Sequence, residues 1–206
     1  MKATAAVMHQ VNAPLSIEQV DLDAPARNEV LIRTAFAGVC HSDLHFMEGL
    51  YPCACPCVLG HESSGVVIAV GSDVTYVKPG DHVITCVSVF CGECEYCLSG
   101  RMSLCVSPAT QRPPGGPQRM SLDGKPMPAA LPLSSFADHM LVHEHAVVKI
   151  RPDMPLDRAA LIGCAVTTGV GAVFRTARVE PGSIVAVIGL GGIGLSAVNG
   201  AAIAGA

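Results

Sequence analysis

Charged residues are scarce in this sequence, and tryptophan is absent. Asp, Glu, Lys and Arg make up 15% of its 206 residues, against about 25% in a typical soluble domain. Because 50% of the residues are hydrophobic, the chain can bury a sizeable core. Its net charge of −4 excludes the basic surface of a nucleic-acid-binding protein. The 21 glycines and 15 prolines stay below the share typical of disordered chains.

The first residues of the sequence do not fit the pattern of a secretory leader, and we expect none. Only six small or apolar residues, 3–8, follow Lys2, where a leader needs about 7–15. We expect this segment to form a β-strand and the protein to be cytoplasmic. The ten cysteines are too few for a disulfide scaffold. In a reducing compartment they are better explained as metal ligands or catalytic groups.

One uncharged run is long enough to raise the question of a membrane span. Residues 181–206 contain no charged side chain, and their number suffices to cross a bilayer. Seven glycines, Ser196 and Asn199 interrupt the run, which disfavours a spanning helix. We therefore expect no membrane segment.

The first three quarters of the chain have the pattern of a β domain. Turn residues divide residues 1–153 into short apolar stretches, which predicts a compact β-barrel or sandwich. Residues 107–135, rich in proline and glycine, predict a long irregular loop. The strands predicted after the first are residues 29–39, 64–70, 82–86, 136–143 and 146–150.

Residues 154–206 have the pattern of an α/β domain. Helical spacing covers residues 156–163 and 166–178. The apolar residues 184–188 predict a strand of a parallel sheet, and residues 191–203 predict a helix. The fold class is therefore mixed β and α/β, with a domain boundary near residue 153.

Four cysteines have the spacing C-x2-C-x2-C-x7-C: Cys91, Cys94, Cys97 and Cys105. Four thiolates held by tight turns form a closed zinc site, which stabilises a lobe and leaves no open position for catalysis. An iron–sulfur cluster also uses C-x2-C-x2-C, but the C-x3-C-P ending of that motif is absent. The remaining interpretation, a set of buried structural thiols, fits poorly with a short polar loop. We favour structural zinc.

Three further positions each offer one metal ligand: Cys40, His61 and Cys164. A catalytic zinc typically takes three protein ligands and leaves its fourth position open. These residues would form such a Cys2His set. Taken singly, each also fits an ordinary buried side chain, and sequence spacing does not show that the three meet.

A glycine motif follows the predicted strand 184–188. Gly189, Gly191 and Gly194, with Gly192 among them, fit G-x-G-x-x-G between an apolar strand and an apolar helix. In that context the glycines let the backbone approach a pyrophosphate at the helix N-terminus. A dinucleotide is the expected ligand.

Together these motifs resemble those of the zinc-dependent medium-chain alcohol dehydrogenases. Residues 60–74 fit the family's zinc signature, G-H-E-x2-G-x5-G-x2-V, and the other motifs lie in the family's order. Residues 123–126 and 135–137 resemble its long-loop dimeric branch, which includes the class I and class III enzymes. The resemblance covers essentially the whole chain. It implies a GroES-like β-barrel followed by the start of a Rossmann dinucleotide-binding domain.

The resemblance implies two Zn2+ per chain. Cys40, His61 and Cys164 would bind a catalytic zinc, and the four-cysteine lobe a structural one. Asp43 would hydrogen-bond His61 and fix its orientation. Glu62 would lie behind the metal and approach it during ligand exchange.

Further roles are implied around the cofactor and substrate. Ser42 and His45 would form a proton relay from the bound alcohol to solvent, although Ser42 also fits an ordinary helix N-cap. His41 would lie near the cofactor pyrophosphate, and Thr168 near the nicotinamide. The other histidines are expected on the surface or in packing: His9, His82, His139, His143 and His145.

The implied activity interconverts alcohols with aldehydes or ketones. Zinc would acidify the bound alcohol, and a hydride would pass to C4 of the nicotinamide of NAD. NADP stays open, because the residue that reads the ribose lies beyond Ala206. A homodimer is implied as well.

The substrate is expected to be a small primary or aromatic alcohol. In class III enzymes a carboxylate near residue 51 helps recognise a glutathione adduct, and this chain has Tyr51 there. Tyr51 and Val87 would line the substrate pocket.

Two other functions stay open at this point. A non-catalytic GroES-like zinc-binding module would keep the structural zinc alone, although the ligands, relay and glycine motif all persist here. A sibling dehydrogenase would act on polyols or on a thiol-linked aldehyde adduct. Many polyol enzymes lack the four-cysteine lobe, which disfavours that reading.

The nucleotide-binding motif lies close to the end of the sequence. Only 12 residues follow Gly194, whereas a βαβ unit takes about 30. We expect these residues to be a fragment of a longer enzyme, itself without measurable dehydrogenase activity.

One cysteine-rich segment departs from the family's pattern. Cys53, Cys55 and Cys57 lie a few residues before His61. They could be small apolar fillers, redox-active thiols or a competing metal site. Cys86 is expected in the core.

Overall fold

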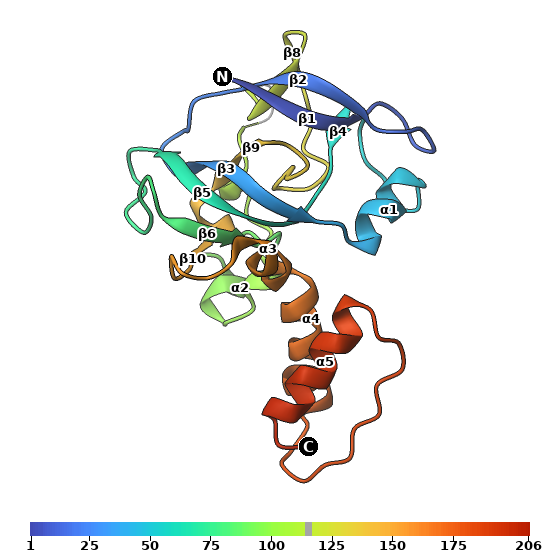
Figure 1. The fold of residues 1–206 in the computed structure, drawn as a ribbon. Helices are drawn as coiled ribbons and strands as arrows, with labels where there is room; N and C mark the ends of the chain where they lie inside the picture. Colours follow the sequence, from blue (N-terminus) through green and yellow to red (C-terminus); the bar gives the residue numbers. More distant parts are fainter. Residues whose placement is uncertain (114–116) are drawn as a thin grey trace.

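The computed structural model describes residues 1–113 and 117–206. In these residues the strands form two five-stranded sheets, ordered β4-β1-β2-β7-β8 and β10-β6-β5-β3-β9. The strand pairs in the described residues are antiparallel, and the sheets form the body at the top of Figure 1. The strands are β1 (Lys2–Met8), β2 (Ser16–Leu22), β3 (Glu29–Gly38), β4 (Cys57–Val58), β5 (Glu62–Val70), β6 (His82–Thr85), β7 (Met120–Leu122), β8 (Lys125–Pro126), β9 (His139–His143) and β10 (Val147–Lys149).

Strand β3 lies between two hydrophobic clusters. Successive side chains of a strand point to opposite faces, and this rule divides its apolar residues. Leu31 packs into the cluster shared with β1 and β2. Val30 and Ile32 pack into the cluster formed with β5 and β6. The β domain is therefore held together on both faces of one central strand.

The loop predicted over residues 107–135 contains regular structure. Strands β7 and β8 form a hairpin through Asp123 and Gly124, whose φ angles are 49° and 74°. Two central residues with positive φ are the signature of a tight hairpin turn, for which Asp-Gly is a favoured pair. The prediction was wrong here because this turn signal lies inside a proline-rich stretch. Residues 114–116 of the predicted loop lie outside the described residues.

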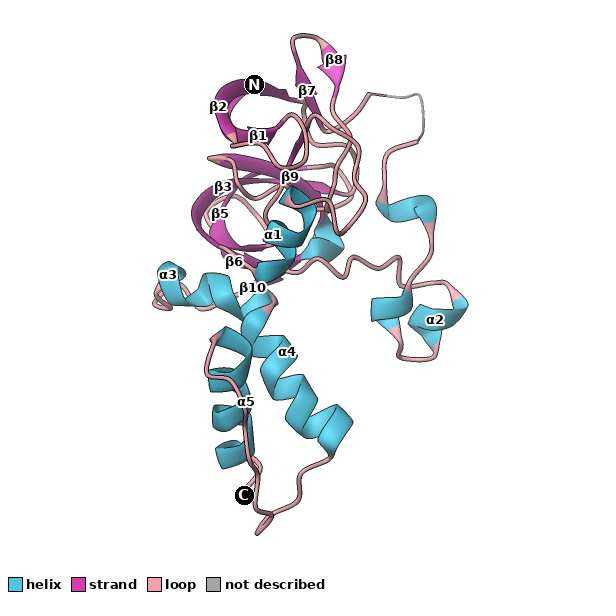
Figure 2. Cartoon of the chain, turned by 90° about the vertical axis from the view of Figure 1, so that its right-hand side faces the viewer, coloured by secondary structure: helices cyan, strands magenta, loops and turns pink. Residues whose placement is uncertain are grey.

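A helical part follows the sheets and extends away from them (Figure 2). Helix α3 (Leu156–Ala159) continues as a 3-10 turn over Ala160–Gly163, and α4 (Ala165–Gly171) continues as a π-helical turn over Ala172–Ala177. Arg178, with φ of 51°, ends that turn. Helix α5 (Gly192–Ile203) packs beside α4.

The strand predicted over residues 184–188 does not form. Ile184 and Ile188 are fully exposed, and no strand is assigned between Arg178 and α5. A parallel strand needs a hydrogen-bonded neighbour on at least one side, and the described residues provide none there. The segment is an extended connection instead.

The prediction that Cys86 lies in the core was also inaccurate, since Cys86 is half-buried.

No single described helix is long and apolar enough to cross a membrane. Two consecutive helical segments, Leu156–Gly163 and Ala165–Ala177, would together be long and apolar enough, but they are bent by 51° where they meet.

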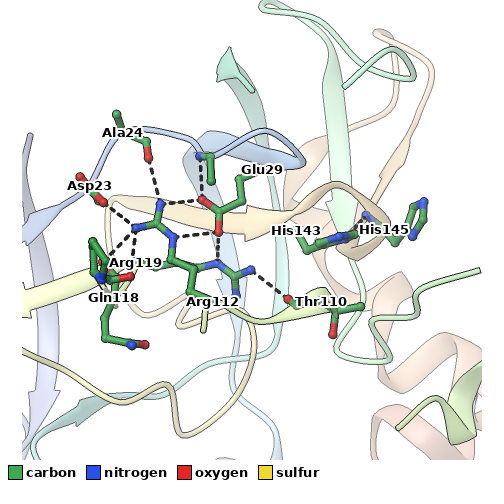
Figure 3. Close-up of polar contacts among 11 residues, drawn as sticks. Asp23, Ala24, Glu29, Thr110, Arg112, Gln118, Arg119, His143 and His145 are labelled. Carbon is green, nitrogen blue, oxygen red and sulfur yellow. Dashed lines mark hydrogen bonds and ion pairs between the residues drawn. The ribbon is translucent and has the colours of Figure 1, made fainter. Parts of the chain in front are cut away.

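A buried carboxylate joins distant loops of the β domain (Figure 3). Glu29 accepts hydrogen bonds from Arg112 Nη2 at 2.7 Å and from Arg119 Nε at 2.7 Å. It also accepts the backbone N–H of Ala26 at 2.9 Å. Burial raises the pKa of Glu29, but these donors outweigh burial and leave the pKa below its usual value.

Candidate metal centres and the surrounding site

The three predicted ligands of the catalytic zinc meet in space. Cys40 follows β3 and is the N-cap residue of α1 (His41–Met47). His61 immediately precedes β5, and Cys164 is the N-cap residue of α4. Cys164 Sγ lies 3.9 Å from Cys40 Sγ and 3.5 Å from His61 Nε2. Residues separated by up to 124 positions therefore converge at one point.

This geometry fits a tetrahedral zinc ion. With Zn–S about 2.3 Å and Zn–N about 2.0 Å, tetrahedral angles place two thiolates about 3.8 Å apart and a thiolate about 3.5 Å from an imidazole nitrogen. The measured separations, 3.9 and 3.5 Å, agree with both values. The donor set of two sulfurs and one nitrogen is also one that zinc prefers.

Asp43 is the residue that holds this arrangement together. It is buried, with 1% exposure. One carboxylate oxygen accepts the backbone N–H of Gly60 at 3.1 Å and lies 3.1 Å from His61 Nδ1. The other oxygen accepts the N–H of Cys40 at 3.0 Å. Because the ring bonds Asp43 through Nδ1, its Nε2 faces the two cysteines.

The same contacts shift the pKa values of the ligands in the absence of metal. Asp43 raises the pKa of His61 to about 9 despite the opposing effect of burial. Burial raises the pKa of Cys40, but the backbone N–H and hydroxyl of Ser42, together with His61, outweigh it and lower the pKa. Burial and the carboxylate of Glu62 raise the pKa of Cys164.

Glu62 is the fourth polar group at this centre. It is 3% exposed, and its carboxylate lies within 4.8 Å of the ligand atoms of Cys40, His61 and Cys164. Its side chain packs against the α-carbon of Gly38, where a Cβ would come within 2.7 Å of Oε2. Glu62 is therefore held close behind the three ligands.

The four-cysteine lobe forms a second centre. Cys94 is the N-cap residue of the short helix α2 (Glu95–Leu98). Its Sγ lies 3.4 Å from that of Cys97 and 3.8 Å from that of Cys105, while the Cys91 and Cys97 sulfurs are 3.9 Å apart. The spacings of 3.8 and 3.9 Å match the about 3.8 Å expected between thiolates on one tetrahedral zinc, and the third is shorter by 0.4 Å.

The four thiols of this lobe differ in their electrostatic surroundings. Backbone N–H groups, that of Glu93 first, lower the pKa of Cys91 to about 6. Burial raises the pKa of Cys97 to about 11. The Cys91 site is thus prepared for a thiolate, whereas Cys97 gives up its proton only when a metal compensates.

Helix α1 holds the two relay candidates one turn apart. Ser42 and His45 are both half-buried and occupy positions i and i+3, which lie on one face of a helix. The N-cap interpretation of Ser42 was wrong, because Cys40 begins the helix. His45 Nδ1 is buried and has no hydrogen-bond partner among the described residues.

Two histidine rings of α1 and the ring of Tyr51, which follows the helix, form an edge-to-face group. The His45 ring lies 4.7 Å from that of His41 and 5.1 Å from that of Tyr51. His41 itself is exposed. Val87 lines a cavity of about 890 Å³, but Tyr51 is not among that cavity's described lining residues. A substrate pocket shared by Val87 and Tyr51 therefore stays a prediction.

The glycine motif begins α5 as expected. Gly191 is its N-cap residue, and Leu195 N–H donates to Gly191 O at 2.9 Å. A Cβ on Gly194 would lie 1.9 Å from the carbonyl oxygen of Gly189, so only glycine fits there. Gly192, the first residue of α5, lies against Ala165 of α4, and Thr168 is exposed on α4.

The comparison with known protein families decides the family. The model of the alcohol dehydrogenase GroES-like domain matches residues 26–152. The chain belongs to this family. The match confirms the resemblance drawn from the motifs, and with the solved structures below it confirms the GroES-like fold class.

Curated relatives of this alcohol dehydrogenase domain are similar over nearly the whole chain. Alcohol dehydrogenase class-3 of Pisum sativum is 46% identical over 212 residues, covering 98% of this chain and 55% of that protein. S-(hydroxymethyl)glutathione dehydrogenase of Escherichia coli O1:K1 is 45% identical over 206 residues, covering 98% and 56%. The chain thus spans little more than half the length of these relatives.

Solved structures show the same relationship. An alcohol dehydrogenase zinc-binding domain protein from Burkholderia ambifaria has a TM-score of 0.92 and 37% identity, covering 100% of this chain and 57% of that one. Benzyl alcohol dehydrogenase from Acinetobacter calcoaceticus has a TM-score of 0.90 and 31% identity, with the same coverage.

Sequence reasoning did not identify the two glycines that position this site. The Gly60 N–H binds Asp43, and its φ is 94°. A Cβ on Gly163 would lie 1.9 Å from the carbonyl oxygen of Thr85. Both precede a candidate ligand directly, in Gly-His and Gly-Cys pairs, and that adjacency was the available signal.

Proposed function

We propose that this chain is the catalytic domain and the beginning of the nucleotide-binding domain of a zinc-dependent alcohol dehydrogenase that uses NAD. The observation that carries the proposal is the convergence of Cys40, His61 and Cys164 at zinc-ligand distances, with Asp43 behind the histidine. A closed structural site would add a fourth thiolate or imidazole. At this centre the fourth group is Glu62, a side chain that can yield its place to substrate.

Bound zinc acts as a Lewis acid that lowers the pKa of a coordinated hydroxyl, and bound NAD accepts a hydride. The chain's own residues hold and move the proton. We propose that Ser42 accepts the proton of the alcohol and that His45 passes it towards solvent. The unpartnered Nδ1 of His45 leaves one ring nitrogen available for that transfer.

The second zinc belongs to the lobe of Cys91, Cys94, Cys97 and Cys105. Four thiolates satisfy the metal completely, so this site stabilises the protruding segment around α2. It takes no part in the reaction.

The cofactor binds at the N-terminus of α5. The free backbone N–H groups of a helix start and its dipole attract a pyrophosphate, and the glycines leave room for it. His41 and Thr168 are proposed to contact the pyrophosphate and the nicotinamide respectively. We propose NAD and leave NADP as the alternative outcome of a direct binding comparison.

The proposed substrate is a primary or aromatic alcohol. Tyr51 is 44% exposed beside the relay helix, with its ring 5.3 Å from that of Phe46. It offers an apolar edge to an alcohol, and it lacks the carboxylate expected for recognition of a glutathione adduct. A second candidate is S-(hydroxymethyl)glutathione, which the name of the Escherichia coli relative specifies.

The complete protein is proposed to be a cytoplasmic homodimer. None of the ten cysteines forms a disulfide in the described structure, which suits a reducing compartment.

The test is a steady-state assay of the complete protein with NAD and either benzyl alcohol or S-(hydroxymethyl)glutathione. We expect the higher kcat/KM with benzyl alcohol, and loss of activity in His61→Asn. His139→Asn is the matched control, because His139 also bonds an aspartate, at 2.9 Å, outside both candidate metal centres. A preference for the glutathione adduct would replace the substrate proposal. Zinc binding without either activity would establish a non-catalytic zinc module.

A further inference from the structure

A third group of cysteines lies apart from both proposed zinc sites. The Sγ atoms of Cys53, Cys55 and Cys57 all lie within 4.8 Å of one another. Cys53 and Cys55 belong to the segment between α1 and β4, and Cys57 is the first residue of β4. This part of the chain lies at the side of the β domain where α1 lies (Figure 1). The described residues add no other cysteine, histidine or carboxylate to this group.

The group has a fixed inner end and an open outer end. Cys57 is fully buried in β4, where it pairs with Met8 of β1. Cys53 is half-buried and packs against the apolar cluster formed by Met8, Cys57 and Leu59. Cys55 is exposed. An ion can therefore enter past Cys55 and reach a thiol that the sheet holds in place.

The surroundings are rich in sulfur and poor in oxygen donors. The thioether residues Met8 and Met47 pack in the cluster that contains Cys57 and Cys53. Thiolates and thioethers are soft ligands, which select Cu(I) over hard cations such as Mg2+ or Ca2+. Structural zinc takes four protein ligands, whereas three thiolates are a complete set for monovalent copper.

Two of the three thiols, Cys53 and Cys57, have a raised pKa. Burial raises the pKa of Cys53 and of Cys57, and the neighbouring thiols raise that of Cys57 further. Metal binding must therefore displace protons.

We propose that Cys53, Cys55 and Cys57 form a third metal site, which binds one Cu(I) ion through three thiolates. Binding breaks the S–H bonds, releases the protons to solvent and forms three Cu–S bonds. The copper stays monovalent and no sulfur is oxidised.

The test adds Cu(I) anaerobically to the zinc-loaded protein in the presence of a Cu(I) chelator, removes the chelator complex, and counts copper and zinc per chain. We expect about one copper per chain bound by sulfur alone, with the zinc content unchanged. X-ray absorption at the copper edge identifies the ligands.

Cys55→Ser is the decisive variant, because an exposed side chain can change without disturbing the core. We expect it to lose the copper while keeping its thermal stability and its zinc. Cys86→Ser is the matched control, since Cys86 is half-buried and outside all three cysteine groups; it should keep the copper. Equal copper in wild type and Cys55→Ser, copper gained only as zinc is lost, or no copper in the wild type would each overturn the proposal.

Discussion

At the scale of single residues, Asp43 links the parts of the proposed catalytic centre. Its two oxygens contact three groups from two segments: the N–H of Cys40, and the N–H of Gly60 with the ring of His61 beside it. Sequence alone suggested only the last of these contacts. The other two depend on backbone amides, whose direction no residue type specifies.

Replacing Asp43 should weaken one zinc site and leave the other intact. Partners behind a metal-bound histidine typically contribute 10–100-fold to affinity, so we expect Asp43→Asn to lower zinc affinity at the Cys40 centre by about that factor. Zinc competition with a chelator measures it. Asp138→Asn is the control, since exposed Asp138 also bonds a histidine and a backbone N–H. Equal zinc retention in the two variants would contradict the assigned role.

His143 should make stability depend on pH. Burial, His145 and Arg119 lower its pKa to about 4, and its Nδ1 accepts the N–H of His145 at 3.1 Å, which requires an unprotonated nitrogen (Figure 3). In the unfolded chain a histidine has a pKa of about 6.5. Between these values only the unfolded state binds the proton, so the free energy of unfolding falls as pH drops from 6.5 to about 4.

The contribution of His143 is at most about 3 kcal/mol, since one pKa unit corresponds to about 1.4 kcal/mol. Urea unfolding of wild type and His143→Asn over this pH range measures it. Asn preserves an acceptor and does not titrate, so its profile should be flatter below pH 6.5. Parallel profiles for the two proteins would show that the imidazole is not held neutral.

At the scale of elements, the junction between the β domain and α4 depends on a close approach. Gly163 brings the backbone before Cys164 against the carbonyl of Thr85 in β6. Gly171, at the end of α4, has nothing within 4 Å of its would-be Cβ and has helical angles. A side chain at Gly163 would therefore clash with the backbone of β6, whereas a side chain at Gly171 would meet no other atom.

Alanine at the two positions should give changes of opposite sign. Gly163→Ala forces the backbones apart and should cost about 1–3 kcal/mol, as overpacked sites do, with loss of metal at Cys164. Gly171→Ala should stabilise the helix by about 1 kcal/mol. Denaturant unfolding and zinc counts on both variants test this. A stable, fully zinc-loaded Gly163→Ala protein would show that the contact does not position Cys164.

Local patterns predicted most elements, but tertiary partners decided the exceptions. Strands β1, β3, β5 and β6 follow from apolar runs between turns, and α5 follows from its glycine start. The extended segment 184–188 has a strand pattern without a neighbouring strand. The Glu29–Arg112 pair spans 83 positions, a contact that no sequence period encodes.

At the scale of the whole molecule, the two parts differ in how well they bury apolar surface. The β domain encloses its clusters, whereas Ile184, Ile188 and much of α5 remain exposed. The chain spans little more than half the length of its curated relatives. The candidate ligands were predictable from the sequence because each lies next to residues that belong to a recognisable motif. Their meeting was predicted only through the family resemblance, because it requires β3, β5 and α4 to converge and no local pattern encodes that.

The measurement that tests this account most directly is the zinc content of the purified protein and two variants. We expect about two zinc ions per chain in the wild type, and about one in both His61→Asn and Cys97→Ser. Each variant removes a ligand from one centre and leaves the other untouched. Fewer than two zinc ions in the wild type, or an unchanged count in His61→Asn, would contradict the claim that Cys40, His61 and Cys164 form a zinc site separate from the four-cysteine lobe.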